Sequence, residues 1–121
     1  MIDINCRILP ATKYGAKHFE ESVSMAKKSY EQGVRKIIAT PLLSSEISQL
    51  DIVKQVENLN LRLKQDGVQI TVYPGCEGNF NSSLLNQMRE EQIFPLAMNS
   101  RYFLVSIDSV ELPYYFTEII F

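Results

Sequence analysis

The sequence predicts an α/β domain in which about four parallel strands form a sheet and the helices pack outside it. Short apolar strands alternate with amphipathic helices along the 121 residues, and this alternation is typical of a parallel sheet with right-handed crossovers. The length suits one hydrophobic core, so we expect a single domain over residues 1–121. The functional site of such a fold lies at the carboxyl ends of the strands.

The first strand is expected within the opening ten residues. Because strand side chains alternate between faces, Asn5 and Arg7 point one way, whereas Ile4, Cys6 and Ile8 point the other way. Two polar groups on one face, at the end of an apolar strand, indicate a site.

The first helix is expected to follow and to end at Gly33, a suitable C-terminal stop. Its apolar face is formed by Phe19, Val23, Ala26 and Tyr30.

The second strand is expected over 36–40, and Pro41 ends it. The second helix should be capped by Ser44 or Ser45 and stop at Gly67. Its predicted apolar stripe is Val53, Val56, Leu59 and Leu63. A third strand is expected over 68–73 and is broken by Pro74 and Gly75. A short helix capped by Asn81 or Ser82 should follow, carrying Leu84, Leu85 and Met88. The last two expected elements are a fourth strand over 101–107 and a helix over 112–121 with Pro113 in its first turn.

Composition excludes several classes of partner. The chain has 12 Lys and Arg against 14 Asp and Glu, a net charge of −2, so we expect no nucleic-acid partner. No apolar run reaches the roughly 20 residues that span a bilayer, so no membrane insertion is expected. Asp3 and Arg7 interrupt what would be the apolar part of a signal peptide. With only two cysteines, reduced thiols in a cytoplasmic protein are then expected.

Four stretches together resemble one known family: the opening ten residues, 21–41, the TVYPGCE sequence at 71–77 and the NSRYFLVSI sequence at 99–107. They are similar to the manganese-dependent bacterial protein-tyrosine phosphatases that regulate capsule and exopolysaccharide synthesis, members of the PHP (polymerase and histidinol phosphatase) family. The resemblance implies a distorted TIM-like barrel with metal ions at its strand ends, acting on the tyrosine-rich tail of a membrane-associated tyrosine kinase. Because this sequence resembles only the N-terminal half of the family chain, it implies half of that barrel.

The resemblance also implies that the metal site is largely lost. The family's histidines correspond to Asn5, Arg7 and Leu42, and a glutamate corresponds to Ser106, whereas Glu77 keeps a metal-binding glutamate. Acidic loop residues are replaced around Lys13 and Tyr14, and an arginine is replaced by Asn79. The implied remnant pocket consists of Asn5, Arg7, Leu42, Glu77 and Ser106.

The chemistry of these side chains predicts no catalytic residue and no bound metal, although the family uses manganese or similar divalent ions. Asn is a weak ligand, Arg stays protonated and Leu has no ligand atom, and one carboxylate does not hold a hydroxide-generating metal centre. The sole histidine, His18, is expected at the start of the first helix, away from the strand ends. Without a histidine base nearby in sequence, Cys6 is expected to be a buried, inert thiol.

Two alternatives stay open for Arg7. It could occupy the place of the lost metal, facing Glu77 or an incoming phosphate, since its planar fork suits both carboxylate and phosphate. It could instead reach solvent from an eroded pocket. We expect Arg7 and Glu77 to approach each other. For Tyr114 and Tyr115, packing of a helix face is favoured over a phosphorylated tail.

Three functional hypotheses follow. The first is a catalytically inactive relative that acts as a binding or regulatory protein. The alternatives are a residual metal-dependent phosphotyrosine phosphatase completed by another chain, and a decayed gene product without function. Expected partners are a second copy in a dimer, a tyrosine kinase of exopolysaccharide synthesis or the full-length phosphatase. Half a barrel would leave strand edges and an inner face open, with Val72, Phe103 and Val105 as candidates for the exposed surface.

Overall fold

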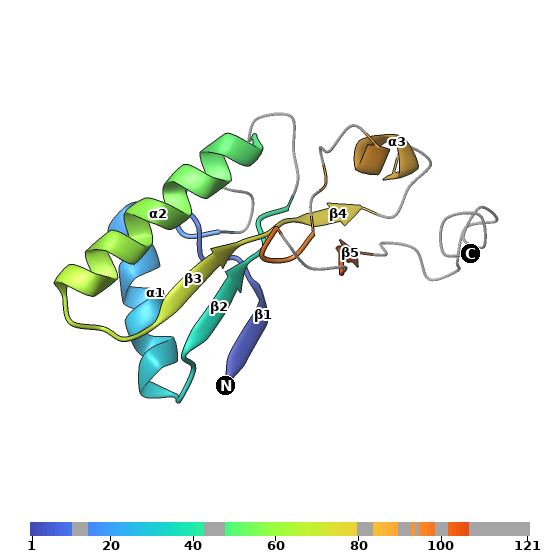
Figure 1. Ribbon diagram of the computed structural model, residues 1–121. Coiled ribbons are helices and arrows are strands. Elements are labelled where there is room, and N and C mark those ends of the chain that lie inside the picture. Colours follow the sequence, from blue (N-terminus) through green and yellow to red (C-terminus); the bar gives the residue numbers. More distant parts are fainter. Residues whose placement is uncertain are drawn as a thin grey trace.

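A parallel sheet flanked by helices forms the body of the molecule, seen in a computed structural model that describes residues 1–10, 15–42, 48–79, 84–89, 93, 95–98 and 102–106 (Figure 1). Several predictions lie outside the described residues: the substituted loop at Lys13 and Tyr14, the capping residues Asn81 and Ser82, and the helix over 112–121 with its tyrosines. No helix among the described residues is long and apolar enough to cross a membrane.

The main sheet has three parallel strands in the order β1-β2-β3, spanning Ile2–Cys6, Lys36–Ala39 and Thr71–Pro74. Helices α1 (Phe19–Glu31) and α2 (Gln49–Gln65) make the two crossovers. Both helices contribute to one core cluster with Ile37 and Val72, which lie opposite each other in the β2–β3 register. The predicted α/β class with a parallel sheet is confirmed.

A second, smaller sheet pairs β4 (Glu77–Asn79) with β5 (Leu104–Ser106) in parallel. Figure 1 shows β4 continuing from the end of β3. The predicted end of the third strand at Tyr73 is therefore wrong. Pro74 belongs to β3, and the chain resumes pairing after only Gly75 and Cys76. The described residues thus contain five strands in two sheets where we expected about four strands, and the expected fourth strand is reduced to β5.

Gly75 allows the chain to pass close to β2 at this break between β3 and β4. A Cβ atom at this position would lie 2.9 Å from Ile38 Cγ2 and 3.0 Å from the Ala39 carbonyl oxygen. Contacts under 3.0 Å force a shift, so a side chain at position 75 would require Ile38 or the backbone at Gly75 to move.

Helix α1 begins as predicted, with His18 as its N-cap. His18 Nδ1 accepts a hydrogen bond from the Glu21 backbone N–H at 3.2 Å, which satisfies one of the unpaired donors of the first turn. Val23 and Ala26 are buried, and Gly33, at φ +95°, follows the helix in the left-handed conformation that glycine favours.

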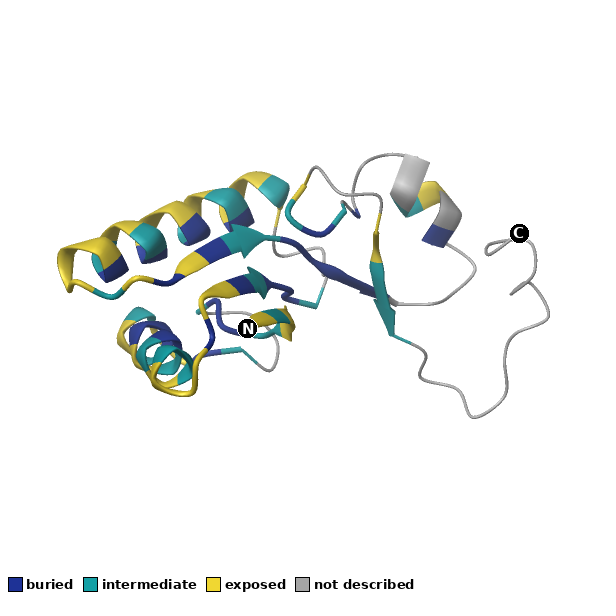
Figure 2. Cartoon of the chain, turned by 60° about the horizontal axis from the view of Figure 1, so that its bottom comes forward, coloured by how far each residue is buried: buried dark blue, intermediate teal, exposed yellow. Residues whose placement is uncertain are grey.

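Helix α2 begins later than predicted. Ser48 is its N-cap and forms a capping box with Asp51, so a cap at Ser44 or Ser45, which lie outside the described residues, is wrong. The buried stripe is Ile52, Val56, Leu59 and Leu63. Val53, predicted for the stripe, is only half-buried because Ile52 stands one turn before Val56 and takes the central position. Figure 2 shows this buried stripe on one side of α2 and exposed residues on the other.

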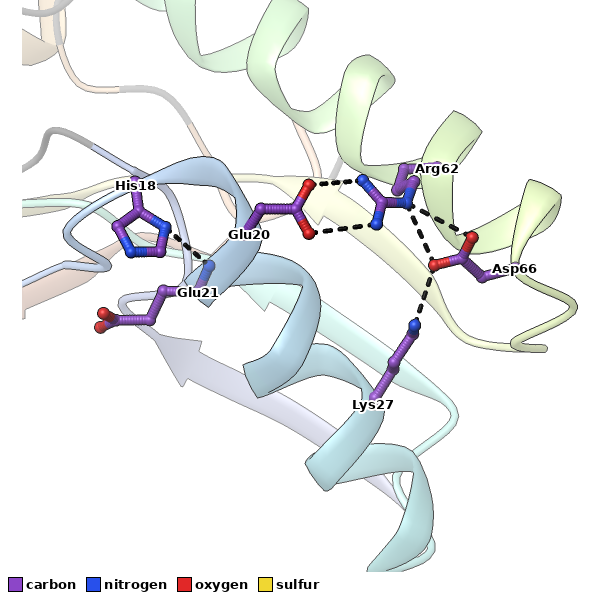
Figure 3. Close-up of polar contacts among 6 residues, drawn as sticks. All are labelled: His18, Glu20, Glu21, Lys27, Arg62 and Asp66. Carbon is purple, nitrogen blue, oxygen red and sulfur yellow. Dashed lines mark hydrogen bonds and ion pairs between the residues drawn. The ribbon is translucent and has the colours of Figure 1, made fainter.

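A chain of ion pairs joins the two helices at their outer surface (Figure 3). Arg62 of α2 pairs with Glu20 of α1 at 2.6 Å and with Asp66 at 3.1 Å, and Asp66 pairs with Lys27 of α1 at 2.9 Å. These contacts place α1 and α2 side by side on the same face of the sheet, as right-handed crossovers require.

On the face of the main sheet opposite the helices lie the alternate strand residues, whose side chains point away from the helices. Because Ile37 and Val72 face the helices, their neighbours Ile38 and Tyr73 face away, and both are half-buried. Ile2, in register with Lys36 on this side, is 57% exposed, and Ile4 is 53% exposed. We call the surface formed by Ile2, Ile4, Ile38 and Tyr73 the open face.

The predicted candidates for this surface are partly wrong. Val72 is 2% exposed because it packs under α2, whereas Phe103 is 38% exposed and Val105 is half-buried against the core. The sequence did not decide which alternate residues of each strand face the helices. In the structure, isoleucines of β1 lie on the open face instead.

Candidate functional site

Arg7 and Glu77 meet at the carboxyl end of the main sheet. Arg7 directly follows β1, and Glu77 is the first residue of β4. Arg7 Nη2 donates a hydrogen bond to Glu77 Oε2, and the two side chains form an ion pair with 28% and 9% of their surfaces exposed. The predicted approach of these two residues is confirmed.

The backbone after β2 holds Glu77 in position. The Glu77 N–H donates to the Pro41 carbonyl oxygen at 3.0 Å, and Leu42 forms an isolated parallel bridge with Glu77. Leu42 therefore pairs with Glu77 through the backbone, and its side chain offers no atom that could bind a metal.

Asn5 forms a separate polar contact at the same end of the sheet, with Thr40. Thr40 Oγ1 donates to Asn5 Oδ1 at 3.2 Å and accepts from the Cys6 N–H at 3.0 Å. Thr40 is 0% exposed, whereas Asn5 is exposed. Sequence reasoning missed Thr40, although a polar residue closing the apolar second strand was a usable signal.

Ser106 lies two register steps beyond Glu77 in the small sheet. It is opposite Asn79, while Glu77 is opposite Leu104, and Ser106 Oγ donates to the Gly78 carbonyl oxygen at 3.4 Å. Of the five predicted pocket residues, Glu77 contacts two others: the side chain of Arg7 through an ion pair and the backbone of Leu42 through a parallel bridge. Asn5 is hydrogen-bonded to Thr40, and Ser106 is hydrogen-bonded to the Gly78 carbonyl oxygen.

These donors do not fit a metal centre. Among the residues that the structure describes, no group of three or more His, Cys, Asp and Glu side chains is placed to hold a metal ion. The Glu77 carboxylate is engaged by a guanidinium that stays protonated, and the Asn5 amide oxygen already accepts a hydrogen bond. His18, as expected, caps α1 and accepts from Glu21 (Figure 3).

Neither cysteine has the environment of a nucleophile. Burial raises the pKa of the Cys6 thiol to about 12, with a smaller contribution from the negative charge of Asp3. Cys76 is buried, and both residues are thiols rather than halves of a disulfide. At neutral pH Cys6 is therefore almost entirely protonated, and the protonated form is a poor nucleophile.

The parallel sheet with its helical crossovers is the fold of half of a PHP-type protein related to tyrosine phosphatases. The chain belongs to the family described as "Capsular polysaccharide synthesis, CpsB/CapC", which it matches over residues 1–118.

Curated relatives agree with this membership. The chain is 29% identical over 124 residues to tyrosine-protein phosphatase YwqE of Bacillus subtilis (strain 168), covering 100% of this chain and 48% of the relative. It is 26% identical over 126 residues to the putative tyrosine-protein phosphatase CapC of Staphylococcus aureus, again covering 100% of this chain and 48% of the relative. The chain thus spans about half the length of both relatives.

The fold also matches a solved structure. A chain from the crystal structures of YwqE from Bacillus subtilis and CpsB from Streptococcus pneumoniae, described as unique metal-dependent tyrosine phosphatases, superposes with a TM-score of 0.89 at 30% identity. The match covers 98% of this chain and 49% of that chain. This protein therefore has the architecture of half of a PHP-type phosphatase fold.

Proposed function

We propose that this chain is a non-catalytic member of its family, a cytoplasmic binding or regulatory protein of capsule or exopolysaccharide synthesis. The ion pair between Arg7 and Glu77 is the observation that carries this proposal. It joins the one retained acidic ligand to a cation that cannot bind metal.

Metal-dependent phosphate hydrolysis requires an ion held by several donors, with an open position for the attacking water. In the part of the chain that the structure describes, the remnant site offers the Glu77 carboxylate, already paired with Arg7, and the backbone neighbour of Glu77 is Leu42, which has no ligand atom in its side chain. These residues can bind and orient a polar group, but they supply neither a metal-bound hydroxide nor a general base. Binding without turnover is the chemistry that they support.

The open face is the proposed interaction surface, and a second copy of this chain is its proposed occupant. Ile2 and Ile4 expose more than half of their surfaces there, and a net charge of −2 gives little repulsion between copies. Edge pairing through β1 is disfavoured because the Asn5 N–H is already bonded to Asp3 Oδ1 at 3.0 Å and the register is irregular between Asp3 and Cys6. A tyrosine kinase of exopolysaccharide synthesis or the full-length phosphatase would be further partners.

The proposal is tested by assaying hydrolysis of a phosphotyrosine peptide with added manganese, using YwqE of Bacillus subtilis as the positive control. We expect turnover indistinguishable from buffer. Asn5→His combined with Arg7→His should not raise it, because these two substitutions still leave Leu42 and Ser106 without ligand atoms suited to a metal centre.

The second candidate, a residual phosphatase completed by another chain, is favoured by the retained carboxylate of Glu77. Metal-dependent turnover that disappears in the Glu77→Ala variant would support this candidate and overturn the non-catalytic proposal. Elemental analysis gives an independent measure, since stoichiometric manganese, iron or zinc in the purified protein would also speak for the enzyme.

A further inference from the structure

Glu77 is a nearly buried carboxylate at the junction of the two sheets. The residue is 7% exposed and opens β4, directly after the break at Gly75 and Cys76. Removing a carboxylate from water is costly unless a positive charge and hydrogen bonds compensate it. The fold therefore needs a cation at this position.

Arg7 meets this need from a different part of the chain. It reaches Glu77 across 70 positions of sequence, and through this contact the end of β1 is joined to the start of β4. A guanidinium stays protonated at every physiological pH and is more weakly hydrated than an ammonium, so it suits a mostly buried pair.

We infer that Arg7 is a built-in cation that takes the place of a metal ion at Glu77, and that it links the three-stranded sheet to the two-stranded sheet. Stability then requires the ion pair and is independent of divalent metal. The inference deepens the proposed function, but its test measures unfolding rather than turnover, so either one can fail alone.

The chain contains a matched control for this pair. Glu20 and Arg62 form the same kind of ion pair at the surface, where their side chains are 63% and 33% exposed. Glu77→Gln and Glu20→Gln make the same chemical change and keep the side-chain size. They differ in the burial of the carboxylate that is neutralised, which is 9% exposed in Glu77 and 63% exposed in Glu20.

Thermal unfolding of these variants tests the inference. Glu77→Gln should lower the melting temperature by more than about 5 °C, because it removes a nearly buried carboxylate whose ion pair with Arg7 joins the two sheets. Glu20→Gln should lower it by less than about 3 °C. In the Glu77→Gln background, adding Arg7→Met should lower the melting temperature clearly less than Arg7→Met lowers that of the wild type. Equal effects of the two glutamate changes, or strictly additive effects of Arg7→Met and Glu77→Gln, would overturn the inference.

Added ions test the wild-type protein without any substitution. Millimolar manganese chloride, EDTA and inorganic phosphate should each leave the melting temperature unchanged. Stabilisation by manganese that EDTA reverses would show that Glu77 still binds a metal, and it would overturn the inference. Stabilisation by phosphate that Arg7→Met removes would show that Arg7 serves an anion instead, which also contradicts it.

Discussion

Thr40 shows how a single buried hydroxyl organises the end of the sheet. Its Oγ1 donates to Asn5 Oδ1 and accepts from the Cys6 N–H, and its own N–H donates to the Cys6 carbonyl oxygen at 2.8 Å. The side chain thus replaces regular strand pairing where the β1–β2 register becomes irregular. It contacts Asn5, which lies two positions before Arg7.

Thr40→Val should test this role, because it keeps the shape and removes both side-chain hydrogen bonds. We expect a loss of about 1–3 kcal/mol in the free energy of unfolding, since the partly buried Cys6 N–H would lose its acceptor, Thr40 Oγ1. The free energy of unfolding is measured by urea denaturation. The matched control is Thr71→Val, at an exposed position of β3, which should change stability by no more than about 0.5 kcal/mol. A neutral Thr40→Val would show that solvent reaches the Cys6 N–H.

At the scale of elements, α1 and α2 are held together by a shared core and by the ion pairs at their surface. The hydrogen bond from Arg62 is the main cause that lowers the pKa of Glu20, and the hydrogen bond from Lys27 is the main cause that lowers the pKa of Asp66. Because the folded state lowers both pKa values, the pairs contribute stability above the unfolded values and lose it as the pH falls through the folded ones.

This linkage predicts an acid-dependent stability that Arg62→Met should reduce. Urea midpoints of the wild type should fall as the pH decreases below the ordinary carboxyl values of 4.5 and 3.8, and part of this fall should disappear in the variant. High salt should have a similar effect at neutral pH, because exposed pairs are screened. Identical pH profiles for the wild type and Arg62→Met would contradict a stabilising role for these pairs.

At the scale of the whole molecule, the open face is the surface that we propose for self-association. The helices cover one side of the main sheet, while Ile2 and Ile4 expose 57% and 53% of their surfaces on the other side. Burial of apolar surface contributes about 25 cal/mol per Å², against an association cost of roughly 4–15 kcal/mol. A stable dimer therefore needs an interface of at least about 1,000 Å².

We expect a two-fold dimer at tens of micromolar protein, measured by sedimentation velocity, since this symmetry is the commonest. Ile4→Glu should yield monomers, because it places a charge within the proposed interface. Leu50→Glu is the control. Leu50 is 81% exposed on α2, on the helix side of the sheet, so this variant should remain dimeric. A monomeric wild type, or equal effects of the two substitutions, would refute the proposed interface.

The sequence by itself determined the features that depend on local pattern and on residue chemistry. The alternation of strands and helices, the start of α1 at His18 and the pairing of Arg7 with Glu77 were all predicted and are confirmed. Helical periodicity is a property of neighbouring residues, and it needs no knowledge of the rest of the fold. Glu77 was identified because the TVYPGCE sequence resembles the family.

Only the tertiary structure decided which strand face is buried, where pairing resumes and which polar groups meet. Val72 is buried and Ile4 is exposed because the helices cover only one face of the sheet. In an apolar strand, both sets of alternate residues are apolar, so the sequence does not show which face is covered. β4 exists because β5 and Leu42, distant along the chain, provide its partners. Thr40 contacts Asn5 for the same reason: hydrogen bonds between strands are set by register, which depends on long-range pairing rather than on local sequence.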